Sequence, residues 1–280
     1  MIKNALTVDV EDYFQVSAFA GAIDRKDWDS IPLRVVDSTQ RLLQLFADSQ
    51  VKATFFVLGW VAERVPDLVR DIAAQGHEVA CHGYSHQLVY NQKPDVFRQE
   101  TLRAKSLLED IIQEPVHGYR AASYSITARS LWALDILIEA GFSYDSSVFP
   151  IRHDRYGMPG TPEFPYHLES PSGQSIIEFP LSTARVLGMR LPVAGGGYFR
   201  LYPYQLTRFG LSRINRSNHP FIFYLHPWEI DPGQPRIAAG WLSRFRHYNN
   251  LDRCEARLHK LMKDFRFGRV LDVLEDLQLA

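Results

Sequence analysis

Two histidines four positions apart, His82 and His86 in the segment His-Gly-Tyr-Ser-His, are the strongest local candidates for chemistry. A helical turn through this segment would place both imidazoles on one side, where they could bind the same metal ion. Two histidines and one carboxylate, with positions left for water and substrate, are typical of a catalytic metal site. Because the chain has 10 histidines, a chance pair on the surface is the alternative interpretation.

Three carboxylates, Asp9, Glu11 and Asp12, lie at the end of a short apolar run in the segment Val-Asp-Val-Glu-Asp-Tyr-Phe. Like charges this close need a cation or raised pKa values if their surroundings are apolar. A metal ion together with Arg120 would compensate them, which favours metal binding by the two histidines and one of these acids. The alternatives are a solvated loop, a cap of a short helix by Asp12, and an ordinary surface arginine.

His226 follows a strongly apolar run in the segment Phe-Tyr-Leu-His-Pro-Trp-Glu. A histidine can protonate a leaving group near neutral pH, because its ordinary pKa lies close to that range. The alternative is a structural histidine packed beside aromatic side chains. Trp228 and Tyr224 are candidates for stacking against a sugar ring or for ordinary core positions, and Asp145 lies in a separate turn.

The elements that would position these residues alternate between short apolar strands and longer amphipathic helices. Strands are predicted at residues 5–10, 53–58, 78–81, 116–119, 176–179 and 220–225. Helices are predicted around 42–46 and at 61–74 with a break or late start at Pro66, and also at 95–112, 129–140, 253–265 and 270–277. This alternation is typical of an α/β fold with a parallel sheet. The polar candidates then gather at the carboxyl ends of the strands, where such folds place their sites.

Composition excludes several classes of protein. The chain has 280 residues, 46% of them hydrophobic, and a net charge of −1 from 31 basic and 32 acidic residues. We therefore expect a folded protein without a nucleic-acid partner. No run approaches the roughly 20 apolar residues of a transmembrane helix, and the first residues do not resemble a signal peptide, so we expect a cytoplasmic protein. Two cysteines make no disulfide framework.

Ordered motifs over most of residues 3–230 resemble those of the polysaccharide deacetylase family, the chitooligosaccharide deacetylase-like group called carbohydrate esterase family four. The matching segments, in order, are Leu-Thr-Val-Asp-Val-Glu-Asp, Ala-Thr-Phe-Phe-Val-Leu-Gly, Gly-His-Glu-Val-Ala-Cys-His-Gly-Tyr-Ser-His, Tyr-Arg-Ala-Ala-Ser-Tyr, Tyr-Asp-Ser-Ser and Leu-His. The first motif, the Leu-His-Pro-Trp-Glu-Ile-Asp stretch and the C-terminal region are similar to a subgroup of exopolysaccharide biosynthesis associated with exosortase genes.

The resemblance implies a distorted (β/α) barrel, typically of seven strands, within a single domain of residues 1–280. Residues from about 230 to 280 would form a subgroup-specific, irregular helical extension. The family's metal is usually zinc, sometimes cobalt or another divalent ion. The implied activity is hydrolysis of N-acetyl groups on N-acetylhexosamine units of an exopolysaccharide or its lipid-linked precursor.

Roles also follow from the resemblance, position by position. Asp9 would be the general base, oriented by Arg120, and His226 would be the general acid, supported by Asp145. The metal would be held by His82, His86 and one acid of the first motif. Ser123 and Tyr124 would lie at the oxyanion and Trp228 at the substrate.

The sequence departs from the family pattern where the metal carboxylate is expected, because Val10 directly follows Asp9. The ligand must then be Glu11 or Asp12, and we favour Asp12 because the family uses an aspartate. Ala122 stands where the arginine motif usually has proline, which makes that loop less rigid.

Other functions are compatible with the same fold. One is an amidohydrolase of the same superfamily that acts on a small cyclic or linear amide, and another is a catalytically silent carbohydrate-binding barrel. The intact set of candidate residues argues against the silent barrel. A cytoplasmic deacetylase would meet its substrate at the membrane face, so peripheral contact with membrane-associated polysaccharide synthesis machinery is expected. The sequence leaves the sugar, the ion and the oligomeric state open.

Overall fold

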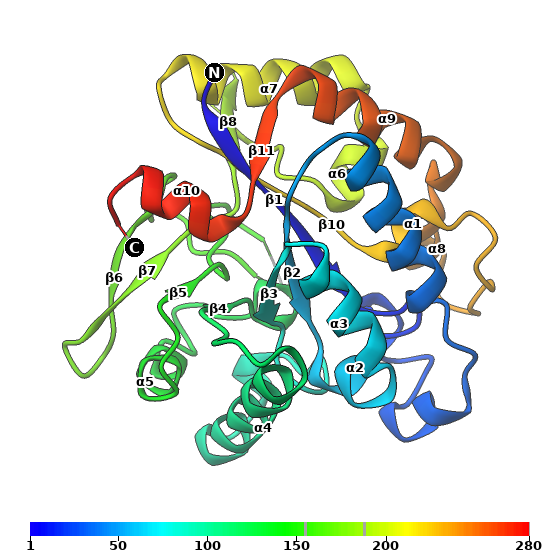
Figure 1. Ribbon diagram of the computed structural model, residues 1–280, viewed down its shortest axis with the longest axis vertical. Helices are drawn as coiled ribbons and strands as arrows, with labels where there is room; N and C mark the ends of the chain where they lie inside the picture. Colours follow the sequence, from blue (N-terminus) through cyan, green and yellow to red (C-terminus); the bar gives the residue numbers. More distant parts are fainter. Residues whose placement is uncertain (154–155, 187–188, 280) are drawn as a thin grey trace.

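The computed structural model, which describes residues 1–153, 156–186 and 189–279, is built around one mostly parallel sheet (Figure 1). Its strands follow the order β10-β1-β2-β3-β4-β5-β7-β6, and β11 also pairs with β1. Only β6 runs antiparallel to its neighbour among the pairings of this sheet in the described residues. The strands are β1 (Lys3–Val10), β2 (Thr54–Val57), β3 (Glu78–Cys81), β4 (Gly118–Tyr119), β5 (Tyr144–Asp145), β6 (Tyr166–Glu169), β7 (Ser175–Glu178), β10 (Ile222–Leu225) and β11 (Arg266–Gly268).

Helices surround this sheet, as Figure 1 shows. They are α1 (Val35–Asp48), α2 (Gly59–Arg64), α3 (Pro66–Ala74), α4 (Pro94–Ile112), α5 (Trp132–Glu139), α6 (Gly196–Leu201), α7 (Tyr204–Arg216), α8 (Trp241–Tyr248), α9 (Leu251–Asp264) and α10 (Val270–Asp276). The predicted break at Pro66 is confirmed, since this residue opens α3. A separate hairpin pairs β8 (Thr183–Val186) with β9 (Met189–Pro192). Among the described residues, none of the helices combines the length and apolar character needed to cross a membrane.

Alternation along β1 decides which side chains reach the interior of the curved sheet. Val8 and Val10 pack in the larger apolar cluster, beneath the helices, whereas Ala5 belongs to the second cluster. Because side chains alternate along a strand, Asp9 shares the face of Ala5. The second apolar cluster fills this inner face. Residues of α10 complete the cluster beside the start of β2. There the backbone N–H of Val270 donates to Thr54 Oγ1 (2.8 Å).

The α/β fold and the barrel-like strand order agree with expectation. Seven strands of the path run parallel (β10, β1, β2, β3, β4, β5 and β7), and within the described residues the hydrogen-bonded sheet stays open between β6 and β10. The expected extension after residue 230 is helical in α8, α9 and α10, but it also contributes β11 to the sheet. The C-terminal region is therefore part of the core architecture and not a mere appendage.

Candidate active site

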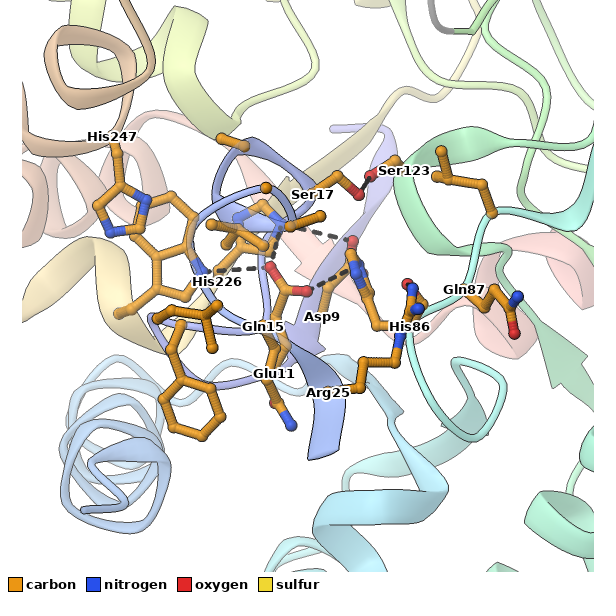
Figure 2. Close-up of a pocket in the computed structure, with 18 of the residues that line it drawn as sticks. Asp9, Glu11, Gln15, Ser17, Arg25, His86, Gln87, Ser123, His226 and His247 are labelled. Atoms are coloured by element: carbon orange, nitrogen blue, oxygen red, sulfur yellow. Dashed lines mark hydrogen bonds and ion pairs between the residues drawn. The ribbon is translucent and has the colours of Figure 1, made fainter. Parts of the chain in front are cut away.

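Glu11, His82 and His86 converge at the carboxyl ends of β1 and β3. Figure 2 shows Glu11 and His86 side by side. One ligand atom from each lies within 4.8 Å of the others, and all three side chains are buried. The predicted helical turn through residues 82–86 is wrong, because the chain forms a loop in which Gly83 and His86 have positive φ angles of 73° and 50°. The loop still places the two imidazole rings 5.4 Å apart. The predicted pair of histidines therefore meets by a different local route.

The carboxylate beside the histidines belongs to Glu11, which corrects our preference for Asp12. Glu11 Oε2 lies 2.8 Å from His86 Nε2. Asp12 instead accepts hydrogen bonds from the backbone N–H groups of Tyr13 (2.8 Å), Arg34 (2.8 Å) and Val35 (2.9 Å). Its carboxylate thus satisfies donors at the start of α1, where a helix has no internal acceptors.

The donor set fits a divalent cation. His82 Nδ1–H donates to the carbonyl oxygen of Arg120 (2.8 Å), so His82 Nε2 keeps its lone pair. This arrangement is typical of metal-bound histidines. Burial lowers the pKa of His82 to about 4, which keeps the ring neutral and able to coordinate. Glu11 Oε2 faces His86 Nε2, and Glu11 Oε1 accepts from Trp228 Nε1–H (3.2 Å), so both carboxylate oxygens are held beside the histidines.

Asp9 and Arg120 form a buried ion pair, as the predicted roles require. Arg120 Nη1 donates to Asp9 Oδ1 (2.6 Å) and to Thr7 Oγ1 (2.9 Å). Its other nitrogens bind the carbonyl and hydroxyl oxygens of Ser146 at 3.1 and 3.0 Å. The guanidinium also lies 4.0 Å over the ring of Phe56. Arg120 is thereby fixed on several sides, and it fixes Asp9 in turn.

His226 faces the same acids from the end of β10. Its Nε2 lies 3.9 Å from Asp9 Oδ2 and 3.6 Å from Glu11 Oε1. Its Nδ1 lies 2.8 Å from Glu229 Oε1. Burial opposes the charged ring, but the hydrogen bond to Glu229 and the nearby carboxylates raise the pKa of His226 to about 9. These contacts therefore favour the positively charged imidazolium form of His226 at neutral pH.

Glu229 was missed by the sequence reasoning, although it ends the same Pro-Trp-Glu segment as Trp228. The other oxygen of Glu229 accepts from Arg200 Nε (2.6 Å), and both side chains are buried. Burial disfavours the Glu229 carboxylate, but the charges of Arg200 and His226 outweigh this and lower its pKa to about 2. The spacing of three between His226 and Glu229 was a usable signal. Nothing in the sequence marked Arg200.

Asp145 does not take the supporting role that we expected, because Glu229 holds His226 Nδ1. Asp145 Oδ1, at the end of β5, accepts from Ser147 Oγ (2.6 Å). Burial raises the pKa of Asp145 to about 6 and also raises that of Glu178 beside it. Two buried carboxyls side by side are stable when they share a proton. Asp145 therefore belongs to a structural pair beneath the site.

The residues assigned to substrate and oxyanion occupy different places. Ser123 and Tyr124 lie in a left-handed turn on the cavity wall, with φ angles of 51° and 56°. Ser123 Oγ lies 2.7 Å from Ser17 Oγ (Figure 2). Trp228 is only 7% exposed and stacks on His226 (4.9 Å) and His247 (4.0 Å). We therefore assign Trp228 to positioning Glu11 and not to stacking on a sugar.

Asp9, Glu11, His226 and the two converging histidines line a cavity of about 1080 Å³. It extends from Asp9, Glu11 and the histidines to polar and aromatic side chains contributed by several segments of the chain, including Arg25, Trp28, Tyr90, Tyr156 and Arg246. The volume exceeds the range of about 300–1,000 Å³ that is usual for small-molecule sites. The cavity therefore has room for more than a single small ligand.

Comparison with known proteins divides the chain into two matched regions. Residues 27–143 match the family described as polysaccharide deacetylase, and residues 146–275 match a domain of unknown function, DUF3473. A peptidoglycan deacetylase of Helicobacter pylori is 32% identical over 112 residues, which cover 39% of this chain and 36% of that protein. A chitooligosaccharide deacetylase of Bradyrhizobium sp. is 30% identical over 99 residues, or 35% and 43% of the two chains. The matches thus span less than half the length of these relatives.

Solved structures share the fold over nearly the whole chain. A Mycobacterium smegmatis structure described as a polysaccharide deacetylase has a TM-score of 0.64 at 18% identity, over 99% of this chain and 91% of that one. The Puue allantoinase structure has a TM-score of 0.62 at 16% identity, over 100% and 92%. Shared fold, ordered motifs and curated relatives agree. Residues 27–143 therefore match the polysaccharide deacetylase family, and the whole chain shares the fold of solved structures described as such deacetylases.

Proposed function

We propose that this protein is a metal-dependent hydrolase that removes N-acetyl groups from N-acetylhexosamine units of a carbohydrate and releases acetate. The observation that carries the proposal is the convergence of Asp9 and His226 on the Glu11–His82–His86 cluster. A general acid, a general base and a cation site are then close enough together to act on the same amide bond. The match of residues 27–143 to the polysaccharide deacetylase family and the similar curated deacetylases support this reaction class.

Glu11, His82 and His86 would hold the divalent ion, and zinc suits a set of two imidazoles and one carboxylate. When bound, such an ion polarises a carbonyl group and lowers the pKa of a coordinated water. Trp228 and the Arg120 carbonyl keep Glu11 and His82 in place through the hydrogen bonds described above. Cobalt or another divalent ion is compatible with the same donors.

The proton transfers follow from the two groups that flank the cluster. Asp9, held by Arg120, accepts the proton of the attacking water. Ser123, on the cavity wall, is our candidate for stabilising the oxyanion through its backbone N–H. His226 donates the proton at Nε2 to the departing amine, so that acetate and a free amino sugar leave. Glu229 holds the opposite ring nitrogen and stabilises the charged ring until transfer.

The first test is acetate release from N-acetylglucosamine oligomers by the purified protein, after chelation and again with zinc or cobalt added. We expect chelation to abolish release and the added ion to restore it. Asp9→Asn should retain the bound metal and lose about 10²–10⁴-fold in turnover. Near-normal release by this variant would contradict the assignment of Asp9 as the base.

Ring opening of a cyclic ureide, measured with the same chelated and metal-restored protein, tests the alternative of a small-amide hydrolase. The size of the cavity favours a carbohydrate oligomer over a compact amide. Turnover of the ureide with no release from any N-acetylhexosamine oligomer would favour the alternative.

We also propose that the natural substrate is an exopolysaccharide or its lipid-linked precursor. The region that matches DUF3473 supplies His226, Glu229 and Arg200. Because this region lies outside the match to the deacetylase family, it supports a specialised substrate. The association with exosortase genes and the cytoplasmic location stay predictions.

A further inference from the structure

Helix α8 carries three large apolar side chains that point away from the protein. Trp241 is 78% exposed, Phe245 is 50% exposed and Leu242 is 43% exposed. At about 100° of rotation per residue, the three side chains fall within about 100° of arc on one side of the helix. We call these three residues the α8 face.

The opposite side of α8 is fixed to the molecule. His247, on that side, is buried and stacks on Trp228 (4.0 Å) and against Phe19 (4.7 Å). His247 Nε2 lies 2.6 Å from Gln234 Oε1. The helix is thus held in one orientation, and the α8 face is a fixed outward surface.

In the segment of residues 232–251, which contains the α8 face, all the charged side chains are arginines. Arg244 and Arg246 flank the apolar arc on its two sides, and Arg236 precedes the helix; all three are exposed. No Asp or Glu occurs between residues 232 and 251. Exposed aromatic and aliphatic side chains bordered by arginines are the composition of helices that lie in the interface of an anionic membrane.

The helix also lies beside the entrance of the proposed active site. Arg246 and His247 line the cavity that contains Glu11 and His226. Arg200, which holds Glu229, donates to the carbonyl oxygens of Arg246 (3.0 Å) and His247 (2.7 Å). Figure 1 shows α8 at the margin of the molecule, and Figure 2 shows His247 beside the cavity residues. A surface that contacts α8 would therefore lie next to the cavity.

We propose that the α8 face docks on the surface of an anionic lipid bilayer, with Trp241, Leu242 and Phe245 in the interface and the arginines near the headgroups. Basic residues near an anionic surface and apolar side chains in the interface both contribute to such binding. The docked orientation would place the cavity near membrane-attached carbohydrate. This last consequence rests on the proposed deacetylase function, whereas the docking itself does not.

The test is sedimentation of the full chain with vesicles of phosphatidylcholine alone or mixed with phosphatidylglycerol. We expect binding to the mixed vesicles that weakens as salt is raised. Trp241→Ser/Phe245→Ser should weaken binding about tenfold or more, and Arg244→Gln about fivefold. Phe209→Ser is the matched control, because Phe209 is 47% exposed on α7. This control should bind like the unaltered protein.

Acetate release from soluble oligomers separates this proposal from the deacetylase proposal. Trp241→Ser/Phe245→Ser should release acetate like the unaltered protein, which also shows that the variant folds. Lack of binding of the unaltered protein to the mixed vesicles would overturn the docking proposal, and so would an equal loss in Phe209→Ser. A dimer that this double substitution dissociates, without any vesicle binding, would instead assign the α8 face to a second copy of the chain.

Discussion

Glu11 and Asp12 are neighbours in the chain, but their carboxylates have different tasks. Side chains that alternate along β1 and its continuation bring Asp9 and Glu11 to the cavity, while Val10 packs in the core. Asp12 then faces the start of α1 and accepts three backbone hydrogen bonds. A ligand position that is read from residue type alone therefore falls on the wrong acid, whereas the period of the strand identifies Glu11.

The first residue-scale prediction compares these two acids. Glu11→Gln should lose stoichiometric zinc, because it removes the charged ligand and keeps the size of the side chain. Asp12→Asn should retain zinc, because its side chain does not reach the histidines. Metal content after dialysis, measured by atomic emission, decides between them. Zinc loss in Asp12→Asn with zinc retained in Glu11→Gln would restore Asp12 as the ligand.

A second residue-scale prediction concerns the pH dependence of hydrolysis. A general acid must be protonated, so activity should fall as pH rises through the pKa of His226, which is raised to about 9. Bound metal would offset the charge of Glu11, which leaves Glu229 as the main support of the charged ring. Glu229→Gln should therefore move the alkaline limit of kcat/KM to lower pH, by about one unit or more.

Asp145→Asn is the control for this pH profile. Asp145 hydrogen-bonds Ser147 and lies beside Glu178, so its substitution should leave the alkaline limit unchanged. A shift in Asp145→Asn equal to that in Glu229→Gln would show that Asp145 supports His226 after all.

At the scale of elements, the central strands and the helices beside them were predictable because their apolar spacing is regular, whereas α7, β6 and β11 were not predicted. The strand at 78–81 was predicted at its observed bounds, and the interruption at Pro66 separates α2 from α3. The loop at 82–86 was not predictable, because the positive φ of His86 depends on packing and not on spacing. The partnership of Arg200 and Glu229 joins residues 29 positions apart. Such contacts follow from topology, which local patterns do not encode.

Asp12 also gives a prediction at this scale, because it fastens α1 to the end of β1. Asp12→Ala should lower the free energy of unfolding by about 1–3 kcal/mol, since it leaves the buried N–H of Val35 and the partly buried N–H of Arg34 without their acceptor. Urea denaturation measures the change. Gln44→Ala, at an exposed position further along the same helix, is the control and should stay within about 0.5 kcal/mol. Equal effects would remove Asp12 from its anchoring role.

At the scale of the whole molecule, the two matched regions do not fold as separate sheets. Both regions join one sheet through β1, which pairs with β2 of residues 27–143 on one side and with β10 of residues 146–275 on the other. The acid His226 comes from the second region, and the two metal histidines come from the first. A complete site therefore requires both regions, and we expect the chain to unfold as the single domain that we predicted from the sequence.

Arg200→Met tests this cooperation, because Arg200 joins Glu229 to the carbonyl oxygens of His247 and Asn249. Removing one partner of a buried ion pair costs about 3–5 kcal/mol, so the free energy of unfolding should fall by that amount. Circular dichroism and limited proteolysis in urea should report one transition for both regions. Arg253→Met, at an arginine whose side chain is 67% exposed, should change little. Unfolding of α8 and α9 at a lower urea concentration than the rest of the chain would contradict this expectation. The C-terminal region would then be a separate folding unit that packs against the site without stabilising the rest of the fold.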